Sequence, residues 1–303
     1  MNINKYNFSG FIWGPAKKFT NEILEHINKK FPVLHYYIYD FKNKEDFEKS
    51  VLNIYTTDDI DPNTVKNVKI KNMLNHSFSY TYFKFYIEKP NFRKKKATGN
   101  DLSRVVEAIK KEIREKYKSK ISNYIYDIII HISDNFEQTK DIDIIMKKYK
   151  KHRQHEFINL KYFLKCNFKN NIFNRADMLV RKYSIEQYFK NPNYNFNFYN
   201  KMQKKRIQGN TMKTFIKLIE SLKNGFDKNY PIICSKNYRI HDGSHRTAWA
   251  YYSNRTFIPI KCMSIETSDY SIKWFITHNF SKENIDIINN EIVKINQYLL
   301  IEI

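Results

Sequence analysis

The stretch YRIHDGSHRTAWAYY, residues 238–252, contains the clearest turn in the chain. A short strand-like run ends in Asp242 and Gly243, and Ser244, His245 and Arg246 open a predicted helix. The chain has only six glycines in 303 residues, so a glycine between an acid and a His-Arg pair is informative. Glycine adopts positive φ freely and lets other backbone approach closely. The stretch therefore predicts a chain that passes directly from a strand into a helix at Gly243.

The residues around this turn have the chemistry of a phosphate-binding loop. The first free amides of the predicted helix belong to Ser244, His245 and Arg246, and helix N-terminal amides bind anions. Arg246 can hold a phosphate through two parallel hydrogen bonds, and His245 can donate to the same anion. Asp242 can hold a metal or orient a hydroxyl. A turn followed by an ordinary helix cap is the alternative that this short motif leaves open.

The elements predicted around the turn form a small mixed sheet with helices. A helix over 211–223 is expected, with Asn210 or Thr211 as its cap and Gly225 at its end. Residues 179–189 read as a strand running into a short helix, and residues 191–206 as a long loop. Strands are expected at 231–234, 238–240 and 257–263, and closing helices at 270–278 and 281–300. The apolar face of the 211–223 helix consists of Met212, Phe215, Ile216, Ile219 and Leu222.

This order, with DGSHR before its second helix, resembles the ParB/sulfiredoxin superfamily over about residues 176–264. Members carry a DGxHR-like or GxxR-like loop at this junction. The resemblance implies that the loop and the following helix bind the phosphates of a nucleotide. Sulfiredoxins have a cysteine where Ser244 stands, which argues against sulfinic acid reduction. ParB continues into a helix-turn-helix domain, for which the last 40 or so residues are too few. The positions implied for phosphate binding are Asp242, Gly243, Ser244, His245 and Arg246.

The chain looks nearest to a third branch, similar to the archaeal free-serine kinase, which uses DGHTR-like residues to phosphorylate a small hydroxyl compound. A glutamate is the base in that branch. Glu186, just after the first strand predicted for this domain, is the candidate here, although a solvated surface glutamate is the alternative. Arg206 is a candidate for a second phosphate, and a solvated arginine is again the alternative. The resemblance implies ATP or another nucleotide with Mg²⁺ held by Asp242, and catalysis by Asp242, His245 and Glu186.

The expected function is therefore a kinase-like phosphotransferase acting on a small molecule or sugar-like substrate. Two alternatives remain: a ParB-like DNA-binding protein or nuclease, and a non-catalytic nucleotide-binding regulator. The net charge of +22 suits a nucleic-acid partner, with aromatic residues near 194–199 available to stack on bases. However, the charge is mostly lysine spread along the whole chain, as expected when an A/T-rich genome encodes a protein.

The first half of the chain alternates predicted strands and helices, which is typical of an α/β domain. Strand-like runs cover 11–14, 33–41, 77–87 and 121–135, and helices are expected at 16–30, 44–55 and from a cap at Asn100 or Asp101 to about Lys118. The segment from 141 to 155 is charged and reads as a helix or linker. We therefore expect a domain over 1–155 and a second over 156–303, joined between about 150 and 175.

Two polar clusters follow apolar runs in the first half. His131, Asp134 and Asn135 stand at the end of one predicted strand, where ligands bind in open α/β sheets. The alternative is that His131 faces the core and Asp134 caps a helix. The basic run PNFRKKK, residues 90–96, is a candidate phosphate loop, with a solvated basic loop as the alternative.

Composition places the chain among globular proteins, with 42% hydrophobic and 16% aromatic residues. No apolar run is long enough to cross a bilayer. The opening MNINKYNFSGFIWGP has no charged-then-apolar signal segment, so a cytoplasmic protein without a membrane partner is expected. Cys166, Cys234 and Cys262 are far apart in sequence, which argues against a disulfide framework or zinc site.

Overall fold

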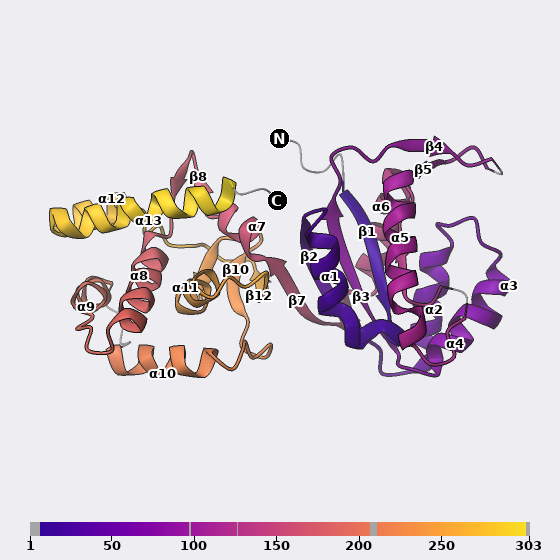
Figure 1. The fold of residues 1–303 in the computed structure, drawn as a ribbon, viewed down its shortest axis with the longest axis horizontal. Helices are drawn as coiled ribbons and strands as arrows, with labels where there is room; N and C mark the ends of the chain where they lie inside the picture. The colour runs from indigo at the N-terminus through magenta and orange to yellow at the C-terminus, as the bar shows by residue number, and fades with distance from the viewer. Residues whose placement is uncertain (1–6, 97, 126, 207–210, 301–303) are drawn as a thin grey trace. The chain divides into compact units, whose positions relative to one another are not determined.

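The computed structural model describes residues 7–96, 98–125, 127–206 and 211–300. Residues 1–6 of the opening segment and Asn210, one of the two predicted caps, lie outside the described residues. The chain divides into two compact units, unit 1 (Met1–Glu156) and unit 2 (Phe157–Ile303), shown in Figure 1. Each unit combines helices with strands, which confirms the α/β (α+β) fold class.

An antiparallel sheet with strand order β2-β3-β1-β6 forms the centre of unit 1. Its strands are rich in aromatic and β-branched residues, which favour pleated structure. Nearly every residue of β1 and β3 is buried, because helices cover both faces of the sheet. The strands are β1 (Asn7–Trp13), β2 (Val33–Asp40), β3 (Ser79–Tyr86) and β6 (Ile130–Ile132).

Helices α1 (Thr20–Asn28) and α5 (Arg104–Tyr117) cover one face of this sheet (Figure 1). They also touch each other, since Tyr117 Oη donates to Glu22 Oε2 at 3.2 Å. Helices α2 (Lys44–Tyr55) and α6 (Phe136–Lys148) share a core cluster with Phe11, Trp13 and Tyr80 on the other face. The short elements are η2 (Gly14–Phe19), α3 (Pro62–Thr64), the π-helical turn η3 (Val65–Ile70), α4 (Lys71–Leu74), η4 (Lys118–Lys120), η5 (Lys150–His152), β4 (Phe92–Lys94) and β5 (Asp101–Ser103).

Three local predictions for unit 1 were wrong. The strand expected over 121–135 is only β6, because Asn123 and Asp127 have positive φ and interrupt it. Basic residues expected in a plain loop form the β4–β5 hairpin. Ser103, rather than Asn100 or Asp101, caps α5 by accepting from the Val106 amide at 3.2 Å.

The segment between the two α/β patterns is also more regular than predicted. Instead of a linker, residues 153–165 form β7 (Arg153–Asn159) and α7 (Leu160–Lys165). Ile158 and Leu160 are fully buried in the core of unit 2, which holds this part of the chain in place. The unit boundary after Glu156 therefore falls inside a strand.

Unit 2 contains the predicted small mixed sheet. Strand β10 (Ile232–Ser235) pairs antiparallel with β11 (Ile240–Asp242) and parallel with β12 (Phe257–Met263). A hairpin of β8 (Phe168–Lys169) and β9 (Ile172–Phe173) precedes it. The helices of the unit are α8 (Ala176–Lys190), α9 (Asn197–Lys205), α10 (Met212–Leu222), α11 (Ser244–Tyr252), α12 (Ile272–Thr277) and α13 (Lys282–Leu300).

Helix α10 matches its prediction. Thr211 caps it by accepting from the Thr214 amide at 3.3 Å, and Gly225 beyond its end has a φ of +109°. Phe215, Ile219 and Leu222 of the predicted apolar face are buried. These contacts join α10 to the core that also contains β10 and α11.

Two predictions between residues 179 and 206 were wrong. Residues 179–189, expected as a strand running into a short helix, lie wholly within α8. This helix is buried on nearly all sides over its first turns and so shows no helical alternation of apolar and polar residues. The expected loop contains α9, in which Phe198, Tyr199 and Met202 lie at helical spacing and are buried.

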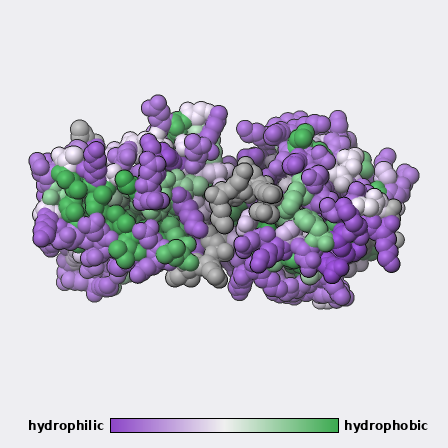
Figure 2. All heavy atoms as spheres, turned by 90° about the horizontal axis from the view of Figure 1, so that it is seen from above, coloured by the Kyte–Doolittle hydropathy of each residue, from purple (hydrophilic) through white to green (hydrophobic). Residues whose placement is uncertain are grey.

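The face shown in Figure 2 is mostly hydrophilic, with scattered hydrophobic patches. Among the described residues, no helix is both long and apolar enough to cross a membrane.

Candidate functional site

The predicted turn lies at the junction of β11 and α11. Gly243 has a φ of +96°, in the left-handed region, and is the residue before α11. An added Cβ would lie 3.0 Å from Ile232 Cγ1 and 3.2 Å from Ile232 Cα. Glycine is thus needed here both for its backbone angle and for the close approach of β10. No side chain caps α11, so its first amides are directed toward the open end of the helix.

Ser244, the first residue of α11, is buried and held by an arginine that the sequence did not single out. Arg175 Nη2 donates to Ser244 Oγ at 2.5 Å, and Arg175 Nη1 donates to the Ile240 carbonyl. The same guanidinium donates to both carboxylate oxygens of Asp177, at 2.8 and 3.0 Å. Arg175 therefore joins strand β11, the turn and the start of α8.

Two further arginines converge on Asp177, whose side chain is 0% exposed. Arg181 Nη1 and Arg206 Nη1 each lie 2.9 Å from Asp177 Oδ2. Burial by itself would raise the pKa of Asp177, but the charges of Arg175 and Arg181 outweigh burial and hold it well below its usual range. We call Arg175, Asp177, Arg181 and Arg206 the arginine cluster.

The arginine cluster carries more positive than negative charge. Among the described residues, no carboxylate other than Asp177 pairs with its guanidinium groups. Arg181 Nε and Arg206 Nε are buried without a hydrogen-bond partner, as is the nearby Gln203 Nε2. The ring of Tyr270 lies 4.0 Å from the Arg206 guanidinium carbon, a cation–π contact that offsets part of the excess. Buried charges without counter-charges are costly, so this arrangement favours binding of an anion.

His245 lies beside the arginine cluster and is half-buried. Its Nε2 is 2.9 Å from Tyr199 Oη, and its ring packs against Phe215. Burial is the main cause that lowers the pKa of His245 well below its usual range, and the charges of Arg181 and Arg206 add to it. His245 is therefore neutral at pH 7, so it can offer a hydrogen bond to a ligand but no charge.

Arg246 and Asp242, at the two ends of the turn, pair with each other. Arg246 Nη1 donates to the carbonyls of Tyr230 and Pro231, the latter at 2.9 Å. Arg246 Nη2 is 3.5 Å from Asp242 Oδ2, and the Asp242 side chain is 71% exposed. The described residues contain no group of three or more metal-ligating side chains. The Mg²⁺ predicted from the sequence would take one ligand from Asp242, with phosphate oxygens and water supplying others, which is a common arrangement for that ion.

Glu186 is not at the end of a strand, because residues 176–190 form α8. Its carboxylate accepts from Lys182 at 2.8 Å and from Lys190 at 2.9 Å, and Lys182 also pairs with Glu291 of α13. Burial would raise the pKa of Glu186, but the hydrogen bonds from both lysines lower it to about 2. The hydrogen bonds and ion pairs of Glu186 among the described residues are with Lys182 and Lys190 and not with the turn at 242–246. By contrast, Arg206, for which a solvated residue was also the alternative, belongs to the arginine cluster.

The main residues that sequence reasoning missed are Arg175, Asp177 and Arg181. Asp177 and Arg181 are four residues apart, which places them on one face of a helix. This spacing is informative only if residues 176–190 are known to form a helix, and the sequence had predicted a strand there.

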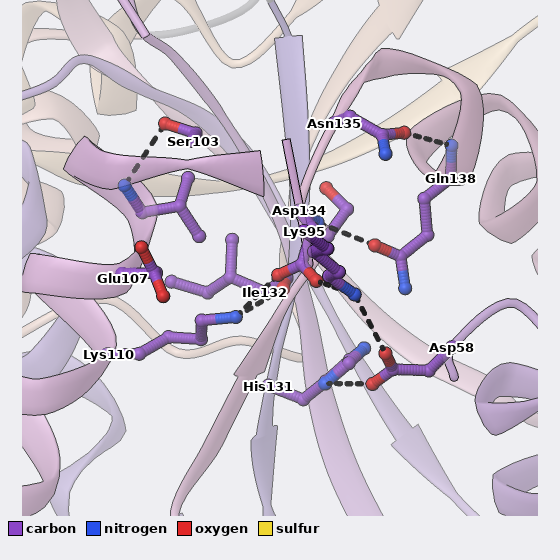
Figure 3. Close-up of polar contacts among 12 residues, drawn as sticks. Asp58, Lys95, Ser103, Glu107, Lys110, His131, Ile132, Asp134, Asn135 and Gln138 are labelled. Atoms are coloured by element: carbon purple, nitrogen blue, oxygen red, sulfur yellow. Dashed lines mark hydrogen bonds and ion pairs between the residues drawn. The ribbon is translucent and has the colours of Figure 1, made fainter. Parts of the chain in front are cut away.

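The predicted polar cluster of unit 1 is a set of internal ion pairs (Figure 3). Asp134 accepts from Lys95 at 2.8 Å and from Lys110 at 2.7 Å. Asn135, not Asp134, caps α6 by accepting from the Gln138 amide at 2.9 Å. The basic run at 90–96 is likewise engaged within the protein rather than left open. Its pairs are Arg93 with Glu107, Lys94 with Asp101, and Lys95 with Asp58, Asp59 and Asp134.

His131 lies in the core of unit 1, 5% exposed, among aromatic rings that include Tyr55 and Trp13. Its Nδ1 is 3.9 Å from Asp58 Oδ2, and its Nε2 has no hydrogen-bond partner. Asp58 and Tyr55 also line a cavity of about 550 Å³ beside α2. Burial lowers the pKa of His131 well below its usual range.

Comparisons of the chain with protein-family models, curated proteins and solved structures found no match. The resemblance to the ParB/sulfiredoxin superfamily therefore stays a prediction, and the arguments about function rest on the geometry of the site.

Proposed function

We propose that unit 2 binds the phosphate groups of a nucleotide at the N-terminus of α11, with the arginine cluster supplying buried positive charge. The charge excess of this cluster is the observation that carries the proposal. Arg175, Arg181 and Arg206 share one carboxylate, and Arg175 is hydrogen-bonded directly to Ser244 at the start of α11. A phosphate would bring negative charge and acceptor oxygens to donors that have no partner.

The helix N-terminus supports the same ligand independently of the arginines. The left-handed Gly243 opens α11 without a side-chain cap, and helix amides with the helix dipole stabilise phosphates. Ser244 and His245 lie in the first turn of α11 and are also close to the arginine cluster. Arg175 donates to Ser244, and the charges of Arg181 and Arg206 act on His245. One anion held between the N-terminus of α11 and the arginine cluster would be stabilised by the positive potential of both.

Arg206→Met is the variant that tests this proposal. It removes one positive charge from a cluster that has more positive than negative charge, so the protein without ligand should keep or gain stability. Binding of ATP and of inorganic pyrophosphate should weaken by about ten- to a hundred-fold, as expected for one lost charge-assisted contact. The control is Lys205→Met, which removes an exposed charge from the neighbouring residue, the last of α9, and should change neither property. Isothermal titration gives affinity and thermal unfolding gives stability.

The result that would contradict phosphate binding is an Arg206→Met protein that loses stability but binds both ligands like the parent. A single-stranded DNA oligonucleotide belongs in the same titration, because a nucleic-acid backbone offers the same phosphate chemistry. Tighter binding of the oligonucleotide than of ATP would favour the nucleic-acid alternative.

We further propose that the bound nucleotide donates its terminal phosphoryl group to a hydroxyl of a small or sugar-like molecule. Such transfer needs positioning and charge neutralisation more than covalent chemistry. Among the predicted catalytic residues, Asp242 keeps an exposed carboxylate beside the turn. It would orient the hydroxyl or share in binding Mg²⁺. Asp242→Asn should then abolish turnover of ATP while leaving ATP affinity within about threefold.

A nucleotide-binding regulator without turnover is the second candidate. The pKa of Glu186 is lowered by two lysines and that of His245 by burial, so neither is a strong base in this structure. Full-length protein that binds ATP tightly but hydrolyses or transfers none across a panel of polyols, amino acids and sugars would favour this candidate.

A further inference from the structure

Two cysteines that are 28 residues apart in sequence meet in the mixed sheet of unit 2. Cys234 of β10 and Cys262 of β12 are register partners on neighbouring parallel strands. Their Sγ atoms are 3.3 Å apart. Neither is part of a disulfide in this structure; Cys234 is buried and Cys262 half-buried. Sequence spacing gave no indication of this pair, because it is made by the β10–β12 pairing.

We propose that Cys234 and Cys262 form an oxidation site that closes to an intramolecular disulfide. Adjacent strands lie about 4.8 Å apart, which is within the Cα separations of about 4.4–6.8 Å seen in disulfides. A sulfur–sulfur bond is about 2.05 Å long, so the two thiols have little more than 1 Å to close. Side-chain rotation and a small shift of the strands can supply that movement.

The half-buried Cys262 is the thiol that a small oxidant reaches first. With hydrogen peroxide, the Cys262 thiolate attacks one peroxide oxygen, the O–O bond breaks, and a sulfenic acid and hydroxide form; the hydroxide takes up the proton that the thiol had released and becomes water. The Cys234 sulfur then attacks the Cys262 sulfur, the S–O bond breaks, and a second water leaves. In total, two thiols are oxidised by two electrons to one disulfide while one peroxide is reduced to two waters.

The position of the pair gives this bond a structural consequence. Ile233, next to Cys234, is the register partner of Asp242, and Ile232 is the residue against which Gly243 packs. A disulfide would therefore fix to β12 the strand on which the turn at 242–246 rests. Formation of the bond itself does not depend on the proposed nucleotide site.

The third cysteine of the chain, Cys166, provides a matched control. Burial is the main cause that raises its pKa to about 11, so it stays a thiol at neutral pH. Thiolates, not thiols, react with peroxide, and Cys166 is therefore expected to take no part.

The experiment treats full-length protein, without reductant, with a small excess of hydrogen peroxide, then blocks free thiols and maps unreduced peptides. The expected product is a monomer that has lost two hydrogens, with the Cys234 and Cys262 peptides joined and released by dithiothreitol. Cys166→Ser should give the same link, and Cys262→Ser should give none. The main result, the peptide map of the parent protein, does not depend on whether any variant folds.

Three outcomes would overturn the proposal: a link that involves Cys166, a disulfide between two chains, or Cys262 oxidised beyond sulfenic acid while Cys234 stays a free thiol. Each can be recognised in the same peptide map. None of them depends on ATP binding, so failure here and failure of the proposed function are separate results.

Discussion

Each unit of this chain contains a cluster of charged side chains, and the two clusters differ in balance. In unit 1, Lys95 and Lys110 face Asp58, Asp59 and Asp134, and the surplus carboxylate is partly open to water, since Asp59 is 38% exposed. In unit 2, Asp177 faces three arginines, and the surplus charge is buried. A paired cluster holds elements together, whereas a buried surplus is stabilised when a counter-ion binds. The difference identifies unit 2 as the better candidate for an anion site.

The comparison is tested most strongly by removing the shared carboxylate. Asp177→Asn leaves three buried guanidinium groups without a counter-charge and should destabilise unit 2 by about 3–5 kcal/mol. Asp134→Asn is the matched change in unit 1, where Lys95 and Lys110 reach water and Lys95 keeps Asp59, so about 1–3 kcal/mol is expected. Urea unfolding measures both. Equal losses would mean that the two clusters are equivalent.

Saturating pyrophosphate sharpens this test, because a bound anion replaces the lost carboxylate. Pyrophosphate should restore part of the free energy of unfolding that Asp177→Asn loses and none of what Asp134→Asn loses.

A smaller effect is expected from glycines with positive φ, of which each unit offers one suited to comparison. Gly243→Ala meets both an unfavourable φ of +96° and the backbone of Ile232, so a loss of about 1–3 kcal/mol is expected. Gly99→Ala in the β4–β5 hairpin has a φ of +71° but nothing within 4 Å, so it should lose about 1 kcal/mol. Thermal unfolding gives both values. If the two losses coincide, the close approach of β10 to the turn contributes nothing.

Two of the histidines whose pKa is lowered, one in each unit, provide a test by pH. His245 and His131 both have a pKa below that of the unfolded chain, so the unfolded state binds more protons once the pH falls below about 6.5. Stability should therefore fall with decreasing pH, each histidine contributing at most about 1.4 kcal/mol per pH unit. His245→Gln and His131→Gln should each reduce this slope between pH 6.5 and 5. The charged groups acting on His245 are Arg181, Asp177, Arg206 and Arg246.

A bound phosphate should affect the pH dependence of one of these histidines and not that of the other. It would offset the charges of Arg181 and Arg206, raise the pKa of His245 and so remove its share of the pH dependence. His131 has no such ligand in this proposal. A pyrophosphate-bound protein with the same slope as the free protein would contradict an anion beside His245.

The sequence predicted some parts of this molecule well because their signals are local. Gly243 between a strand and a helix, and the apolar face of α10, depend on backbone angles and helical spacing that a single segment contains. The mixed sheet followed from short β-rich runs separated by turns. These features need no knowledge of distant residues.

The parts that the sequence did not predict depend on tertiary burial. Helix α8 looks like a strand because it is buried on nearly all sides over its first turns, so its apolar residues do not recur at helical spacing. That error hid the spacing of Asp177 and Arg181 and placed Glu186 beside a strand that does not exist. The pairing of Cys234 with Cys262 likewise arises from strand register, which local patterns do not specify.

The smallest effect is expected for Glu186→Gln, which tests the one predicted catalytic residue that the geometry separates from the turn. Glu186 is bound to Lys182 and Lys190 on the surface of α8, and Lys182 keeps Glu291 as a partner after the change. Ion pairs of this kind contribute about 0–1 kcal/mol, so the loss of stability should stay below about 1 kcal/mol. ATP affinity and any ATP turnover should equal those of the parent, because no step of the proposed transfer uses this carboxylate. A hundredfold fall in turnover with unchanged ATP affinity would instead make Glu186 the base and require α8 to move toward the turn when substrate binds.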